Sequence, residues 1–307
     1  MIEIVLDSVV LPVASGTAIL LAPRLPWSAD AGRRVDAWTG PLACALVVLL
    51  SLIMVEGRTV LYLGQKWEWI AASALIIGIG GTTGTAASLS HRSRHRAILL
   101  TAVALSLVIL RFPGYETLPA RLVATLVAVV AAFLLTTCAS REPVRMPLAL
   151  ALSCGSLTLL LFSAGSLKVA SVAASLASIC ALAALLAYLG RGFSAGASFC
   201  VASMTLSGTM ALYGCAYHAQ EAVSTQIYLL VWATPLLLAF APAFRSPRVA
   251  TVVVVIIAVI CACAVGGSVN FTDALEEVEE TSASYTSITE RGMDGTRALS
   301  WHHAVTV

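Results

Sequence analysis

A series of long apolar segments constrains this chain more than any other feature of its sequence. A bilayer core about 30 Å thick requires roughly 20 residues of helix to cross it, with about 17–25 the usual range. Of the 307 residues, 59% are hydrophobic and 11% are charged, whereas soluble domains average about 45–50% apolar and about 25% charged residues. The sequence therefore predicts an all-α fold, a polytopic integral membrane helix bundle with about ten transmembrane helices. The ten segments are residues 5–22, 38–56, 70–89, 97–112, 119–138, 147–163, 169–189, 195–217, 227–244 and 249–267.

The fourth segment, residues 97–112, is the shortest of the ten. Only 14 uncharged residues lie between Arg96 and Arg111, a length that also fits a re-entrant segment. Long arginine side chains at both ends can extend toward the interfaces and lengthen the effective span. We expect this segment to cross the membrane, with a re-entrant segment as the alternative.

The basic residues divide unevenly between alternate connections, and this division predicts the orientation. By the positive-inside rule, the connections with more lysine and arginine face the cytoplasm. Both termini are then extracytoplasmic, and the protein is expected in the cell (inner) membrane. The richer set is Arg24, Arg33, Arg34, Arg92, Arg94, Arg96, Arg141, Arg145, Arg191, Arg245 and Arg248. The poorer set is Arg58, Lys66, Arg111, Arg121 and Lys168, with Arg291 and Arg297 in the C-terminal tail.

Composition divides the chain into two parts. Residues 1–269 hold all ten apolar segments and form the predicted transmembrane domain. Residues 270–307 contain seven acidic residues in Ser/Thr/Gly-rich sequence, so we expect an acidic, mostly disordered extracytoplasmic tail. Five segments precede residue 140 and five follow it, and an odd number in each half would give two halves of inverted topology.

Ionisable residues are almost absent from the predicted membrane cores. Apart from cysteine and tyrosine, the ionisable residues inside the ten segments are Asp7, Glu56, Arg111 and Arg121, each within three residues of a segment end. Since intramembrane charges usually mark proton relays or ion paths, we expect no metal site and no cofactor. Asp7 is interpreted either as an interfacial acid facing water or as a gate or ligand contact. A net charge of +2 supplies no extended basic face, so nucleic acid is excluded as a partner.

Small and hydroxyl-bearing residues supply polarity inside the membrane instead. The third segment contains Gly80, Gly81, Thr82 and Gly84, and the eighth contains Ser207. One interpretation is close helix packing, because small residues let neighbouring backbones approach. The other is a partly unwound stretch over residues 78–84 that lines a polar path, as in transporters with broken helices. These five residues are therefore candidate pathway residues, together with Asp7.

An acidic group at the outer ends of the helices is the other candidate part of a pathway. Glu221 lies just beyond the eighth segment. Together with other outer acids it would form a cation-attracting vestibule, and the alternative is an ordinary solvated surface. The other acids of this group are Asp7, Glu56, Glu68 and Glu116.

Two motifs bear on enzymatic activity. The run Gly192-Phe-Ser-Ala-Gly196 resembles the Gly-x-Ser-x-Gly motif of rhomboid intramembrane proteases, which pair their serine with a histidine on another membrane helix. The predicted membrane cores of this chain contain no histidine, so we expect no catalytic residue. His91 and His95 stand four residues apart among arginines, which disfavour a bound cation. The eight cysteines all lie in apolar stretches and are expected to act as small apolar residues.

Three functions remain compatible with these patterns, and the least favoured of them is a membrane enzyme. The first is a small-molecule permease, and the length and span count are similar to those of the drug/metabolite transporter superfamily. That resemblance implies termini on the side opposite to the one predicted here, so membership is not inferred. The second is a non-catalytic membrane subunit or scaffold that docks a membrane-protein partner through residues 270–307. All three functions place the protein in contact with the lipid bilayer.

Overall fold

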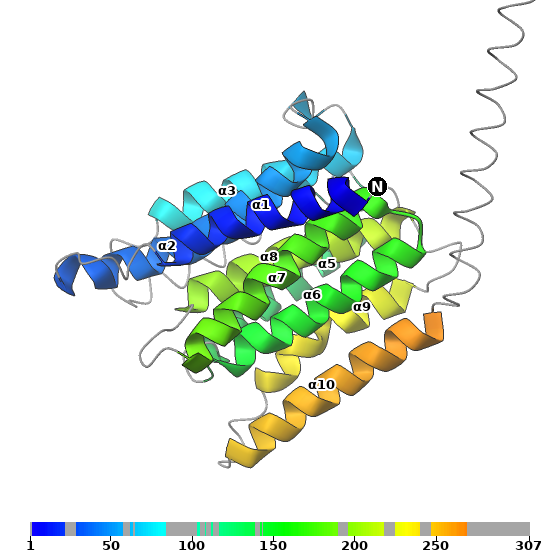
Figure 1. Ribbon diagram of the computed structural model, residues 1–307. Coiled ribbons are helices and arrows are strands. Elements are labelled where there is room, and N and C mark those ends of the chain that lie inside the picture. Colours follow the sequence, from blue (N-terminus) through cyan, green and yellow to red (C-terminus); the bar gives the residue numbers. More distant parts are fainter. Residues whose placement is uncertain are drawn as a thin grey trace, which may run out of the picture. The chain divides into compact units, whose positions relative to one another are not determined.

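In the described residues the protein is helical and has no strand. The computed structural model describes residues 2–21, 29–57, 62–63, 65–83, 103–104, 108, 112, 117–138, 142, 144–189, 196–217, 225–239 and 247–268. Residues Met1–Ser268 form one compact unit (Figure 1). The tail proposed over residues 270–307 lies outside the described residues.

The helices follow the apolar segments closely, as expected where hydrophobicity determines which residues enter the bundle. They are α1 (Ile2–Leu21), α2 (Ala29–Glu56), η3 (Lys66–Glu68), α3 (Trp69–Thr83), α5 (Leu118–Cys138), α6 (Arg145–Ser163), α7 (Leu167–Leu189), α8 (Gly196–Tyr217), α9 (Thr225–Ala233), η4 (Thr234–Ala239) and α10 (Pro247–Ser268). The largest difference is at α2, which begins nine residues before the apolar segment does. Of the fourth segment, only residues 103–104, 108 and 112 are described.

Four of the described helices are long and apolar enough to cross a membrane. They are Thr39–Glu56 in α2, Arg145–Ser163 in α6, Leu167–Leu189 in α7 and Gly196–Tyr217 in α8. Shorter apolar stretches occur in α1, α3, α5, α9 with η4, and α10. The chain therefore has the helices of a membrane protein.

Helix α8 lies at the centre of the helix group. It contacts α2, α3, α5, α6, α7 and α9, and 16 of its 22 residues are buried. Its sequence has no polar face, because small, apolar and hydroxyl-bearing residues are distributed around the whole helix. A helix with this pattern is suited to burial on all sides.

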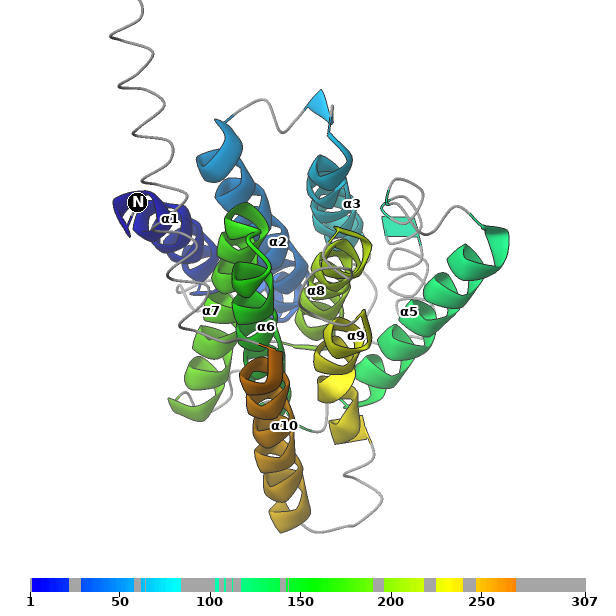
Figure 2. The same ribbon diagram turned by 90° about the vertical axis from the view of Figure 1, so that its right-hand side faces the viewer.

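Two other helices keep an apolar face uncovered at the margin of the group (Figure 2). On α5, Leu122, Val123 and Leu126 are each more than 60% exposed. On α10, Val252 and Val255 are more than half exposed, while the opposite side packs against α6 and η4. Apolar surface of this extent on several helices is expected where lipid, rather than water, is the solvent.

Side-chain contacts join helix ends that are far apart in the sequence. At one end of the group, Lys168 Nζ lies 2.7 Å from Glu56 Oε2 and 5.9 Å from the ring centroid of Trp67. The start of α7, the end of α2 and η3 therefore share that end. At another place, Arg145 of α6 donates a hydrogen bond to Thr251 Oγ1 of α10 over 3.2 Å.

An aromatic group ties the fourth segment to the end of α8. The Phe112 ring meets the rings of Tyr213 and Tyr217 edge to face, with centroid distances of 6.0 and 5.9 Å. The Ser166 hydroxyl, just before α7, donates to Tyr213 Oη over 3.4 Å. The start of α7, the end of α8 and Phe112 are thus neighbours.

Candidate functional site

The candidate pathway residues are described to different extents: one with its side chain, some by the backbone alone and some not at all. Ser207 lies in the middle of α8, is 1% exposed, and donates a hydrogen bond to the Met204 carbonyl over 3.0 Å. The backbone of Asp7 belongs to α1, and the backbones of residues 80–82 belong to α3. Gly84 and Glu221 lie outside the described residues. Among the expected pathway residues, only Ser207 can be placed with its side chain.

The third segment differs from one expectation. Helix α3 is continuous through Thr83, so the unwound alternative for residues 78–84 does not hold over residues 78–83. A Cβ built on Gly78 would lie 2.9 Å from Ala45 Cβ of α2. Glycine at this position therefore permits close contact between two helices, and this contact favours the packing interpretation for the beginning of the stretch.

A broken helix occurs instead in the ninth segment, where α9 ends at Ala233 and the 3-10 turn η4 begins at Thr234, one residue before Pro235. Proline has no N–H, so it cannot donate to the Val231 carbonyl four residues earlier. That carbonyl accepts hydrogen bonds of 2.8 Å from both Ser153 Oγ of α6 and Thr234 Oγ1. The Ser153 bond crosses between helices at a buried position, and it supplies the partner that the proline removes.

Pro235 was present in the sequence as a signal for this break. A proline inside an apolar, helix-length segment predicts a kink or an interruption. The glycine-rich run of the third segment is a weaker signal, because glycine only permits a break whereas proline removes a backbone donor. The compensating serine, Ser153, lies 82 residues earlier and could not be paired with Pro235 from sequence alone.

The upstream half of the broken helix packs on glycines of α8. A Cβ on Gly208 would lie 3.0 Å from Trp232 Nε1, and a Cβ on Gly214 would lie 2.5 Å from the Tyr228 ring. The Trp232 indole donates to the Met204 carbonyl over 3.0 Å. The α8–α9 contact is therefore very close and contains an interhelical hydrogen bond.

Hydroxyls and thiols surround the other side of α8. Cys44 Sγ of α2 lies 3.2 Å from Ser203 Oγ of α8. Three more buried thiols belong to helices of the same group: Cys154 in α6, Cys180 in α7 and Cys200 in α8. These four thiols are buried, as expected for small apolar residues. Together with the serines, they make the centre of the group polarisable and weakly polar but uncharged.

Several core hydroxyls also hydrogen-bond to carbonyls within their own helices. Ser175 donates to Ser171 O over 3.0 Å and lies 3.2 Å from Ser51 Oγ of α2. Thr205 and Thr209 donate to carbonyls three or four residues earlier. A hydroxyl with this geometry is satisfied without a ligand and keeps acceptor capacity for one.

The acidic vestibule is not supported by the two of its members whose side chains are described. Glu56 forms an ion pair with Lys168. Glu68 is 4% exposed and accepts a hydrogen bond of 2.8 Å from the Gln65 backbone. Glu68 is the one charged residue among the buried residues of the described ranges, and it stands in η3, next to the start of α3. Glu68 therefore belongs to the connection between α2 and α3, whereas Glu56 joins the end of α2 to the start of α7.

No group of three or more His, Cys, Asp or Glu side chains placed to hold a metal ion occurs within the described ranges. His91, His95 and Ser194 lie outside these ranges. Comparisons with protein-family models, curated proteins and solved structures gave no match. The geometry around α8 and α9 is therefore the basis for a functional proposal.

Proposed function

We propose that this chain is a ten-span, permease-like membrane protein in which α8 and the broken helix α9–η4 form the substrate pathway. The observation that carries the proposal is the interruption at Pro235, next to the centrally placed α8. Substrate sites in many transporters are formed by discontinuous helices at the middle of the bilayer.

The contacts between helix ends support ten spans with alternating direction. Lys168, Glu56 and Trp67 meet at one end, and the sequence assigns all three to the extracytoplasmic side. Phe112, at the end of the fourth segment, meets Tyr213 and Tyr217, which belong to that side as well. Arg145 and Thr251 meet at the end that the basic residues assign to the cytoplasm. This agreement favours a spanning fourth segment and leaves the 5+5 inverted halves as a compatible proposal.

The chemistry of the centre indicates the substrate class. Hydroxyls of Ser153, Ser203 and Ser207 and the neighbouring thiols offer weak hydrogen-bond donors and acceptors and no formal charge. An ion would have to lose its hydration without a charged partner, which is costly in a low-dielectric interior. A small uncharged molecule is therefore the proposed substrate, and Asp7, Gly80, Gly81, Thr82, Gly84 and Glu221 remain pathway proposals.

Native thiols provide the test, because four of them lie in α8 or in helices that contact it and need no engineering. Membranes containing the full chain are treated with a small, charged methanethiosulfonate, and labelled cysteines are identified by mass spectrometry. A pathway that opens predicts labelling of at least one of Cys44, Cys154, Cys180 and Cys200. We expect Pro235→Ala, which restores a backbone donor at the break, to reduce that labelling several-fold.

The control is Cys263, which is exposed on α10 but faces the surroundings of the bundle. A charged reagent should label it poorly in the membrane, whereas an apolar maleimide should label it well. If all four core thiols stay unlabelled until the protein is denatured, the centre is a packed core and the permease proposal is wrong.

The alternative, a scaffold that docks a partner through residues 270–307, rests on a segment outside the described residues. No observation in the described part of the chain favours it, and it stays a prediction of the sequence.

A further inference from the structure

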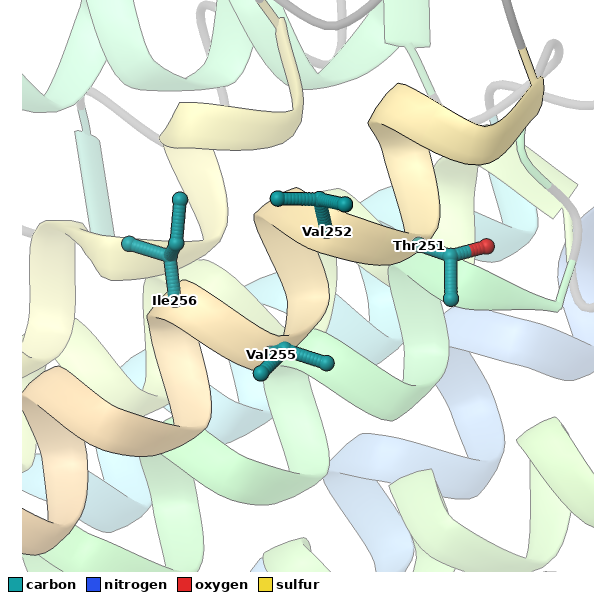
Figure 3. Close-up of a pocket in the computed structure, with 4 residues that line it drawn as sticks. All are labelled: Thr251, Val252, Val255 and Ile256. Carbon is teal, nitrogen blue, oxygen red and sulfur yellow. The ribbon is translucent and has the colours of Figure 1, made fainter.

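A groove on the outer face of α10 differs from the rest of the uncovered apolar surface. It has a volume of about 410 Å³ and is lined by Thr251, Val252, Val255 and Ile256. Figure 3 shows these four side chains projecting from successive turns of α10. The lining is aliphatic except for the Thr251 hydroxyl at the beginning of the groove.

A guanidinium group stands at that polar end. Arg145 of α6 donates through Nη2 to Thr251 Oγ1 over 3.2 Å and through Nη1 to Glu142 Oε2 over 2.8 Å. These bonds use two of the five N–H donors that a guanidinium carries. The Arg145 side chain is 29% exposed, so the group is accessible from outside the bundle. The cationic guanidinium group, with its N–H donors, thus lies next to a row of branched aliphatic side chains.

The sequence adds further positive charge at the same end. Arg248 belongs to the first turn of α10, one turn before Val252, and Arg245 precedes that helix by two residues. Arg141 precedes α6 by four residues. The two connections therefore contain four arginines, counting Arg145, against one acid, Glu142. The basic residues also assign this end to the cytoplasmic face, where anionic lipids attract basic clusters.

We propose that the groove between α10 and Arg145 binds one anionic phospholipid, with its phosphate on Arg145 and Thr251 and an acyl chain along Val252, Val255 and Ile256. The charge complementarity and the aliphatic lining select a lipid, because a soluble phosphate compound would leave the aliphatic strip without a partner. The inference requires membrane insertion of the chain, but it does not depend on the permease function.

The test is native mass spectrometry of the purified full-length protein titrated with phosphatidylglycerol or phosphatidylcholine. Wild type should retain phosphatidylglycerol about tenfold more tightly, because the phosphate is common to both lipids but phosphatidylcholine adds a trimethylammonium cation that the arginines repel. Arg145→Gln should bring the two lipids close to parity, and Arg145→Lys should keep part of the preference. Val255→Trp fills the groove and should weaken retention of both lipids.

Matched controls come from the other uncovered helix, α5. Arg121→Gln and Val123→Trp make the same changes on an exposed apolar helix without the groove, and they should leave lipid retention unchanged. Size-exclusion chromatography of each variant checks that it is folded. If Arg145→Gln does not fold, Val255→Trp still tests whether the groove binds lipid.

Three results would overturn the assignment. One is unchanged phosphatidylglycerol retention in both Arg145→Gln and Val255→Trp. Another is displacement of the lipid by an equal concentration of inorganic phosphate, which would assign the guanidinium to a soluble anion. The third is a wild-type dimer that Val255→Trp converts to a monomer, which would assign the groove to a second copy of the chain.

Discussion

Gly214→Ala is expected to destabilise the folded protein by about 2 kcal/mol, although alanine normally favours a helix over glycine. The added Cβ would lie 2.5 Å from Tyr228 Cε1 and 2.7 Å from Cδ1. Tyr228 is fully buried, so its ring cannot move aside without disturbing its neighbours. The measurement is thermal unfolding in detergent, followed by size-exclusion chromatography of the heated samples.

Gly155→Ala is the matched control. Gly155 is also a helical glycine, in α6, but a Cβ there would meet no atom within 4 Å. This substitution should stabilise the protein by about 0.5–1 kcal/mol, because only the backbone entropy changes. Tyr228→Ala removes the ring that the new Cβ would meet. The double variant Gly214→Ala/Tyr228→Ala should therefore lose clearly less stability than the sum of the losses in the two single variants. Equal melting temperatures for Gly214→Ala and Gly155→Ala would contradict the close α8–α9 contact.

Trp232→Ala should cost about 3–5 kcal/mol, the range for removal of a large aromatic side chain from a core. Trp232 is 6% exposed and donates to the Met204 carbonyl. Trp232→Phe keeps most of the apolar contact and loses the hydrogen bond, so a cost of about 1 kcal/mol is expected. The measurement is again the shift in melting temperature.

Two tyrosine substitutions serve as references for the stability changes of the Trp232 variants. Tyr228→Phe should change stability little, because the Tyr228 hydroxyl lies 3.5 Å from the Leu160 carbonyl, a long hydrogen bond. Tyr188→Ala, at a side chain 77% exposed on α7, should have a small effect. If Trp232→Ala is no more harmful than Tyr188→Ala, then α9 does not pack on α8 as described.

The helix positions were predictable because the hydropathy of the sequence determines them. A backbone in lipid must form its hydrogen bonds internally, so a long apolar run becomes a helix whatever its detailed sequence. Helix α7, for example, begins at Leu167 and ends at Leu189, against a predicted segment of residues 169–189. The start of α2 was less predictable, since its first residues are polar and hydropathy does not report on them.

The candidate site was far less predictable, because it depends on which helices are neighbours. Apolar helices carry little sequence information about partners, so the contact of Ser153 with the Val231 carbonyl is not readable from the segments. Composition identified α8 as hydroxyl-rich but did not predict that six helices surround it. Glu56 was expected among outer acids, and its pairing with Lys168 required the fold to bring α2 and α7 together.

The proposed pathway and the proposed lipid site both require a particular topology. In this topology the chain crosses the membrane ten times and both termini lie outside the cytoplasm. The most direct measurement is a reporter enzyme that is active only outside the cytoplasm, fused after Val307, with a second fusion in the predicted cytoplasmic connection at residues 190–195. We predict activity from the first fusion and none from the second. A cytoplasmic signal after Val307 would mean an odd number of crossings or an inverted orientation, and would contradict this topology.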